Sequence, residues 1–249
     1  MFNSKVTRIS FTIALSVLTI MWLVFILDYS LGLKLYKYGV YPQRNSGLIG
    51  IITAPFIHST KDFSHIFSNS GPIFILTWLL FYHYRDIATR AFVSIFLLTG
   101  ISLWFLGREN YHVGMSGVIY GLTAFLVFSG FFRKNMRVAG ISLFVIFIYG
   151  SMVWGVLPWK EQVSWEGHLL GLFSGLIMAV LLKSIGPQPE KLRYEIEEEL
   201  GIEPELEYWK EDFVPPTTID PDSGIETPVY VYRFVPKPPP TENKEPKND

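Results

Sequence analysis

Six long blocks of apolar residues constrain this chain more than any other feature. They cover residues 9–27, 65–84, 87–106, 113–132, 138–157 and 165–182. An α-helix rises about 1.5 Å per residue, so a block near twenty residues can cross the ~30 Å hydrocarbon core of a bilayer. Apolar residues make up 49% of the chain, and the mean hydropathy is +0.30. We therefore predict an all-α integral membrane protein with six transmembrane helices that contact a lipid bilayer.

The chain divides into a basic membrane part and an acidic tail. Residues 1–186 carry 14 Lys and Arg against 6 Asp and Glu, whereas residues 187–249 carry 7 against 16. The second part also holds 12 of the 16 prolines. We predict a six-helix membrane domain over 1–186 and an acidic, proline-rich tail over 187–249. Within the tail, 190–200 has the pattern of a short amphipathic helix and 228–235 that of a strand.

A long first loop separates the first two blocks, over residues 29–64. It contains an apolar piece, GLIGIITAPFI at 47–57, that is too short to span a bilayer. Such pieces lie in the membrane interface or enter it partway.

The positive charges of the loops predict the orientation in the membrane. With the N-terminus inside, the inner segments hold eight Lys and Arg and the outer segments hold six. The first block is longer than the core of a signal peptide and lacks a small-residue cleavage site after it, so we expect it to be retained. We predict a multi-pass protein of the cell membrane with both termini in the cytoplasm.

The composition excludes several classes of chemistry and partner. The chain has no cysteine, which excludes disulfides, thiolate nucleophiles, iron–sulfur clusters and cysteine-bound zinc. No basic cluster is interleaved with aromatic residues, so nucleic acid is not an expected partner.

Three polar stretches interrupt the apolar blocks. HIFSNSG at 65–71, GMSGVIYG at 114–121 and GHLLGLFSG at 167–175 begin the second, fourth and sixth blocks. Polar groups inside a bilayer are costly and tend to be functional. Even-numbered spans all begin at the same face of the membrane, so we expect the three stretches to lie together.

Two of these stretches predict a serine beside a histidine. Ser116 and His168 lie at similar depth in the fourth and sixth blocks. Small residues spaced four apart let two membrane helices approach closely. Such residues are Gly117 and Gly121 on one block and Gly167, Gly171 and Gly175 on the other. A serine hydroxyl needs an adjacent base to act as a nucleophile, and an imidazole can supply it.

Other residues of the same stretches could support this pair. Tyr120 lies four residues after Ser116, on the same helix face, where it could pack on the imidazole. His65 and Asn69 share a face of the second block and could stabilise a negative oxygen by hydrogen bonds. The backbone N–H of Ser116 would add a donor at a helix N-terminus. Gly114 would free the backbone where the loop turns into the helix.

Each residue also has a simpler interpretation. A serine at a helix start often caps the helix, glycine pairs often serve only packing, and membrane histidines can relay protons in a transporter. His112, four residues before Ser116, is a rival base, which we place in the solvated outer loop. We assign His58 to the structure of the first loop. The coincidence of three motifs at one depth favours catalysis by Ser116 and His168.

The motifs together resemble the rhomboid family of intramembrane serine proteases. The resemblance rests on GxSG followed by YG around Ser116, on HxxxN from His65 to Asn69, and on HxxGxxxG from His168. The loop sequence GVYPQRNSGLIGIITAPFIH, which ends at His58, also resembles the family. The likeness covers residues 9–185.

This resemblance implies a serine endopeptidase that cleaves transmembrane segments of other membrane proteins. Ser116 would be the nucleophile and His168 the base of a dyad with no third acid, and His65 and Asn69 would line the oxyanion hole. The fifth helix and the loop after it would gate access. No metal or organic cofactor is implied. The alternative is a catalytically silent relative that binds or escorts membrane clients.

Overall fold

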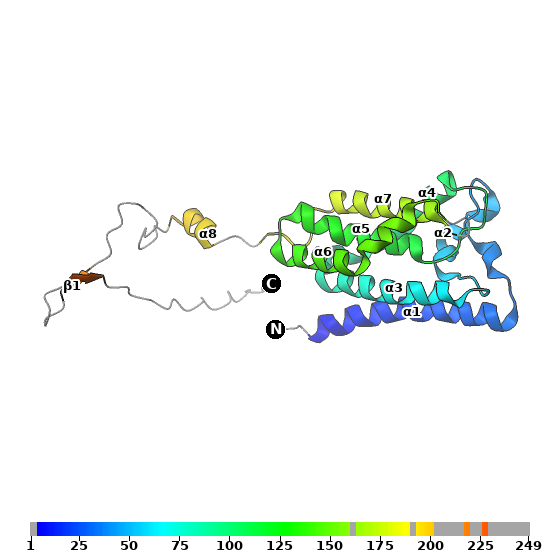
Figure 1. The fold of residues 1–249 in the computed structure, drawn as a ribbon, viewed down its shortest axis with the longest axis horizontal. Coiled ribbons are helices and arrows are strands. Elements are labelled where there is room, and N and C mark those ends of the chain that lie inside the picture. The colour runs from blue at the N-terminus through cyan, green and yellow to red at the C-terminus, as the bar shows by residue number, and fades with distance from the viewer. Residues whose placement is uncertain (1–3, 160–162, 190–192, 202–216, 220–225, 229–249) are drawn as a thin grey trace, which may run out of the picture. The chain divides into compact units, whose positions relative to one another are not determined.

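The computed structural model describes residues 4–159, 163–189, 193–201, 217–219 and 226–228. They belong to two compact units, Met1–Glu190 and Lys191–Asp249. In the first unit, the described residues form helices and the loops that join them (Figure 1).

The second unit contains one short helix and a small sheet. Helix α8, Arg193–Glu199, lies where the sequence predicts an amphipathic helix. Strands β1, Thr217–Ile219, and β2, Glu226–Pro228, pair antiparallel with Thr217 opposite Pro228. Beyond Pro228, the strand predicted over 228–235 lies outside the described residues.

All six apolar blocks form helices. These are α1 (Ser4–Leu31), α3 (Phe63–His83), α4 (Arg85–Leu106), α5 (Ser116–Arg133), α6 (Met136–Tyr149) and α7 (Trp165–Leu181). The fifth differs from the prediction, because the α-helix ends at Tyr149 and the chain continues as a 3₁₀-helix, η4, over Gly150–Val156.

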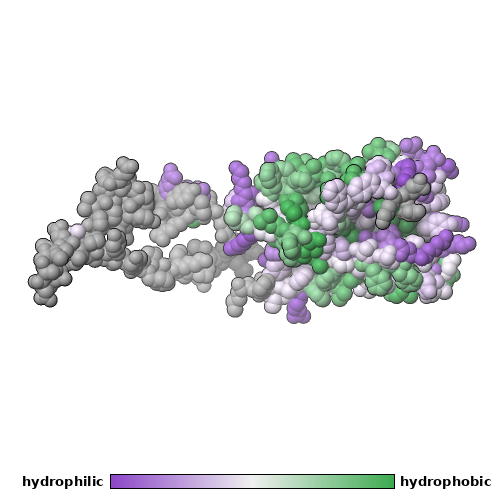
Figure 2. Space-filling view, in the orientation of Figure 1, coloured by the Kyte–Doolittle hydropathy of each residue, from purple (hydrophilic) through white to green (hydrophobic). Residues whose placement is uncertain are grey.

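Several of these helices are suited to a membrane. Among the described residues, α1, α4, α5 and the segment Met136–Val156 are long and apolar enough to cross one, and α7 is a shorter apolar helix. Their outer side chains are apolar, as Leu143 at 67% and Phe147 at 89% exposure illustrate. In the helical unit of Figure 2, apolar surface lies between hydrophilic regions gathered toward the two ends. The chain is an integral membrane protein.

Helix α5 occupies the centre of the helical unit. It packs against α7, α6, α3 and α4, while α1 packs against α3 and α4 packs against α7. Fully buried side chains such as Ile73, Ile95 and Phe125 fill the space between these helices. This arrangement brings the first turn of α5, with Ser116, beside the first turn of α7, with His168.

The long first loop folds onto the loop that precedes Ser116. It contains η1 (Leu35–Tyr38), η2 (Asn45–Gly47), α2 (Gly50–Thr53) and η3 (Ala54–Phe56), and α2 packs against α4. The short apolar piece predicted at 47–57 therefore forms helical turns. Val40 and His112 exchange two backbone hydrogen bonds of 3.0 and 2.8 Å, and Gly114 donates to the Ala54 carbonyl at 2.9 Å. These bonds fix the backbone of His112 and Gly114, just before the first turn of α5.

At the opposite end of α5, Arg133 ties this helix to the end of α7. Its guanidinium donates to the carbonyls of Leu182 at 2.5 Å, Lys183 at 3.2 Å, Ile185 at 2.6 Å and Pro187 at 3.1 Å. It also lies 5.5 Å above the Tyr84 ring. These carbonyls belong to the C-cap residue of α7, Leu182, and to the turns that follow it, where a buried arginine can supply donors that the helix does not.

We predict that Arg133→Gln destabilises the helical unit by about 2 kcal/mol, because it removes the charge-assisted hydrogen bonds that join the end of α5 to the residues after α7. The measurement is thermal unfolding of the detergent-solubilised protein. Lys134→Gln, at the exposed neighbouring position, is the matched control. Equal unfolding temperatures for the two variants would show that the Arg133 contacts contribute nothing.

Candidate active site

Ser116 and His168 form a hydrogen bond between the first turns of α5 and α7. The distance from the serine Oγ to the histidine Nε2 is 2.8 Å. The other ring nitrogen, Nδ1, lies 2.8 Å from the Gly155 carbonyl oxygen in η4. A carbonyl can only accept a hydrogen bond, so Nδ1 carries the proton and Nε2 accepts the serine hydroxyl. The histidine therefore has the tautomer that a general base for serine requires.

The glycines of both helices make this bond possible. A methyl group built on Gly117 would lie 3.0 Å from the Gly167 carbonyl oxygen, and one on Gly121 would lie 3.0 Å from that of Gly171. On α7, methyl groups at Gly171 and Gly175 would collide with the backbone of α5. The backbones of the two helices are thus in direct contact, as the glycine spacing predicts.

Tyr120 packs on the imidazole of His168. The two rings stack with centroids 4.2 Å apart and planes inclined by 9°. The Tyr120 hydroxyl donates to the Met152 carbonyl at 2.6 Å. A methyl group on Gly155 would collide with this hydroxyl. Two backbone carbonyls of η4 thus accept hydrogen bonds from Tyr120 and His168. A sequence motif made of side chains does not indicate such contacts.

His65 and Asn69 lie on α3 beside the loop that leads to Ser116. Gly114 has a φ of +113°, which favours glycine, and a methyl group there would lie 2.8 Å from the His65 ring and 3.8 Å from the Asn69 Nδ2. His65, Asn69, Ser116 and His168 all line one cavity of about 500 Å³. The structure therefore brings the predicted donors to the same cavity as the Ser116 hydroxyl.

His58 is a member of this site that the sequence assigned only to loop structure. Its Nε2 lies 2.9 Å from Asn69 Nδ2 and accepts a hydrogen bond from that amide. Its ring centroid is 5.0 Å from that of His65. His58 is 2% exposed, and burial, with a smaller effect from His65, lowers its pKa from 6.5 to about 3. A neutral His58 orients the nitrogen of Asn69, which retains a second N–H.

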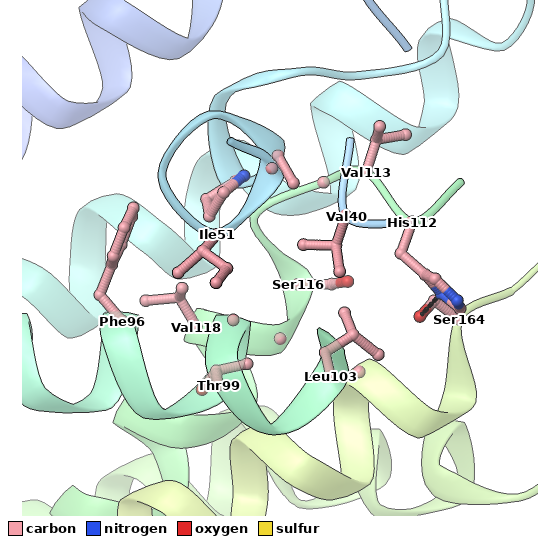
Figure 3. Close-up of a pocket in the computed structure, with 17 residues that line it drawn as sticks. Val40, Ile51, Phe96, Thr99, Leu103, His112, Val113, Ser116, Val118 and Ser164 are labelled. Atoms are coloured by element: carbon pink, nitrogen blue, oxygen red, sulfur yellow. Dashed lines mark hydrogen bonds between the residues drawn. The ribbon is translucent and has the colours of Figure 1, made fainter. Parts of the chain in front are cut away.

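The solvated position predicted for His112 is wrong. Its side chain is 4% exposed and contacts Ser164 and the Arg108 carbonyl. Burial is also the main cause that lowers the pKa of His112. Figure 3 shows His112 and Ser164 at one side of a second, smaller pocket of about 30 Å³, which Ser116 also lines.

A metal site is not evident in the parts of the chain that the structure describes. No three His, Asp or Glu side chains there lie close enough together to hold an ion. Hydroxyl, imidazole and amide side chains, together with the Arg108 guanidinium, line the 500 Å³ cavity.

Comparison of the sequence with known proteins identifies similar proteins of one family. Residues 45–185 match the family model described as the Rhomboid domain. An uncharacterized protein of Mycobacterium tuberculosis is 33% identical over 183 residues, which cover 70% of this chain and 75% of the relative. One from Mycobacterium leprae is 32% identical over 182 residues, or 68% and 70% of the two chains. A putative rhomboid protein of Acanthamoeba polyphaga mimivirus is 29% identical over 152 residues, or 56% and 78%.

We predict that Gly171→Ala destabilises the protein by about 1–3 kcal/mol, because the new methyl group must push α7 away from the Gly117 carbonyl. Gly140→Ala is the matched control, since a methyl group on that α6 glycine meets nothing within 4 Å. Chemical unfolding in detergent measures both. Equal stability of the two variants would contradict direct backbone contact between α5 and α7.

The lowered pKa of His58 predicts a loss of stability in acid. An unfolded histidine binds a proton below about pH 6.5, whereas the folded one does so only near pH 3. Between these two values, each unit by which the pH is lowered reduces the free energy of unfolding by about 1.4 kcal/mol through this group. His58→Gln retains an acceptor but cannot titrate, so its stability should depend less on pH between 6 and 4. Parallel pH profiles of wild type and variant would refute the prediction.

Proposed function

The chain belongs to the rhomboid family, and we propose that it is an intramembrane serine endopeptidase that cleaves transmembrane segments of other membrane proteins. The observation that carries the proposal is the 2.8 Å bond from Ser116 to Nε2 of His168. It joins a potential nucleophile to a potential base of the correct tautomer, in a helical unit suited to a membrane.

The reaction would begin with attack by the Ser116 Oγ on the carbonyl carbon of the scissile peptide bond. His168 Nε2 takes the hydroxyl proton as the new C–O bond forms. The Gly155 carbonyl, which accepts the Nδ1 proton, stabilises the resulting imidazolium and prevents rotation of the ring. This carbonyl performs the orienting task that an aspartate side chain has in a Ser-His-Asp triad.

The negative oxygen of the tetrahedral intermediate requires hydrogen-bond donors. We assign this role to His65, the second N–H of Asn69 and the backbone N–H of Ser116. His168 then gives its proton to the leaving amine as the C–N bond breaks. A water molecule, deprotonated by His168, hydrolyses the acyl ester and restores the Ser116 hydroxyl.

The topology belongs to the same proposal. All six long helices cross the membrane, so the polar starts of α3, α5 and α7 lie at its outer face. Both termini, and the tail after residue 186, are then cytoplasmic, and the cell membrane is the location. The substrate enters beside η4 and α6, because Met152, Tyr149 and Ile148 line the cavity.

A silent relative that binds or escorts clients is the alternative function. It would need neither a serine nor a base, whereas this chain positions both with 2.8 Å between them. A transporter that relays protons would not depend on Ser116. Neither alternative has a specific observation in its favour.

We predict that the solubilised protein reacts with a fluorophosphonate probe and that Ser116→Ala abolishes this labelling. His168→Ala should slow it by at least about 10³-fold without unfolding the protein. Ser174→Ala, which removes another α7 hydroxyl, and His83→Ala, at the far end of α3, are the controls.

Labelling that survives Ser116→Ala would refute the assignment of Ser116 as the nucleophile. Labelling of His168→Ala at the wild-type rate would refute the assignment of His168 as the base. A wild-type protein that binds a membrane client but never reacts with the probe or cleaves the client would favour the silent relative.

A further inference from the structure

The loop that ends at Ser116 carries two side chains to which the reaction gives no role. Arg108 and His112 lie between α4 and α5, and both also line the 500 Å³ cavity. Each contacts the residues around the start of α7, more than fifty positions later in the chain. These contacts lie at the outer end of the α5–α7 pair, opposite the contacts of Arg133.

His112 holds Ser164 through a hydrogen bond of defined direction. Its Nε2 lies 3.0 Å from the Arg108 carbonyl oxygen and must donate to it, so Nδ1 accepts from the Ser164 hydroxyl at 2.7 Å. Figure 3 shows this bond. The backbone of His112 is itself held by Val40 through bonds in both directions. Ser164 is thus joined to a fixed point.

Ser164 does not make the capping hydrogen bond that is usual for a serine at the start of a helix. It is the N-cap residue of α7, where a serine side chain commonly accepts a hydrogen bond from a backbone N–H of the first turn and stabilises the helix. Here the hydroxyl makes no capping bond and instead donates to His112. The start of α7 lacks the stabilising cap bond, and Ser164 instead connects it to the loop that contains His112.

Arg108 makes two further connections to the same segment. Its Nη2 donates to the Val163 carbonyl at 2.9 Å, and its Nε lies 3.3 Å from a carboxylate oxygen of Glu166. Glu166 is 7% exposed. A buried carboxylate is strongly destabilising without a partner, so this pair resists separation.

These contacts lie within five residues of the proposed base, His168. The backbone N–H of His168 bonds to the Ser164 carbonyl at 3.2 Å, and Glu166 is two residues before His168. On the other side, His112 is four residues before Ser116. One loop therefore ends in the proposed nucleophile and holds the turn that carries the proposed base.

We propose that Arg108 and His112, with their partners Val163, Ser164 and Glu166, form a loop clamp that sets the distance between Ser116 and His168. Arg108 and His112 are positioning residues that act through the start of α7. The glycine contacts bring the helices together, and the clamp fixes the height and rotation of the first turn of α7. A misplacement of about 1 Å between reacting groups can cost on the order of 100-fold in rate. This inference rests on the proposed protease function.

A double-mutant cycle on the uncharged pair tests the clamp. His112→Phe and Ser164→Ala each remove the same hydrogen bond, so each should slow fluorophosphonate labelling of Ser116 by roughly 10- to 100-fold. The double variant should be no slower than the slower single variant, because the two residues act through one bond. His112→Asn places an acceptor near the position of Nδ1 and should restore labelling to within about threefold of wild type.

The charged pair and a control complete the test. Glu166→Gln and Arg108→Gln should slow labelling, again with a double variant that is no slower than the slower single one. Glu109→Gln is the control from the same loop, because this exposed residue contacts Arg44 rather than α7. Additive effects in both cycles, or labelling of His112→Phe as fast as that of Glu109→Gln, would overturn the clamp.

Backbone amide hydrogen exchange of residues 165–170 separates the clamp from the proposed function. Protection there should fall in His112→Phe and be retained in His112→Asn, whether or not the probe reacts. If wild type does not label, the protease proposal fails, and the positioning role fails with it. If wild type labels but protection is unchanged in His112→Phe, only the clamp fails.

Discussion

The direct contact of two helix backbones is the constraint on which this structure depends. Helices α5 and α7 meet through glycines, because a methyl group at Gly171 or Gly175 would collide with the opposite backbone. In hydrocarbon, small residues gain close packing without a hydrophobic driving force between helices. Only at this separation can a side chain as short as that of Ser116 reach the imidazole of His168. Arg133 ties the two helices at the opposite end, where their polar groups also need partners.

Much of this arrangement could be predicted from the sequence, for clear physical reasons. Apolar runs near twenty residues located all six helices, and parity together with the GxxxG spacing placed Ser116 near His168. The stacking of Tyr120 followed from its position four residues after Ser116. These features depend on helical periodicity or on spacing within one helix, which a single sequence shows directly.

The remaining features depend on contacts between distant segments. His112 lies among charged and polar loop residues and was expected in solvent, but partners at Val40 and Ser164 bury it. His58 was expected to serve only its own loop, yet it bonds Asn69. The change from α6 to η4 at Gly150 was missed because residues 138–157 were taken as one span, although Gly150 and Ser151 interrupt the apolar run. The residue pattern does not show which carbonyls the 3₁₀-helix then presents.

The use of the Gly155 carbonyl has a consequence for how such a site is inherited. A side-chain carboxylate is encoded by one codon and can be lost by one mutation, but every peptide unit has a carbonyl. What must be preserved is the path of η4, together with a residue small enough to lie against the Tyr120 hydroxyl. A sequence motif can therefore identify the serine and the histidine, but it cannot identify the Gly155 backbone carbonyl that bonds the histidine. Relatives could vary widely in the sequence of this segment while they keep the same hydrogen bond.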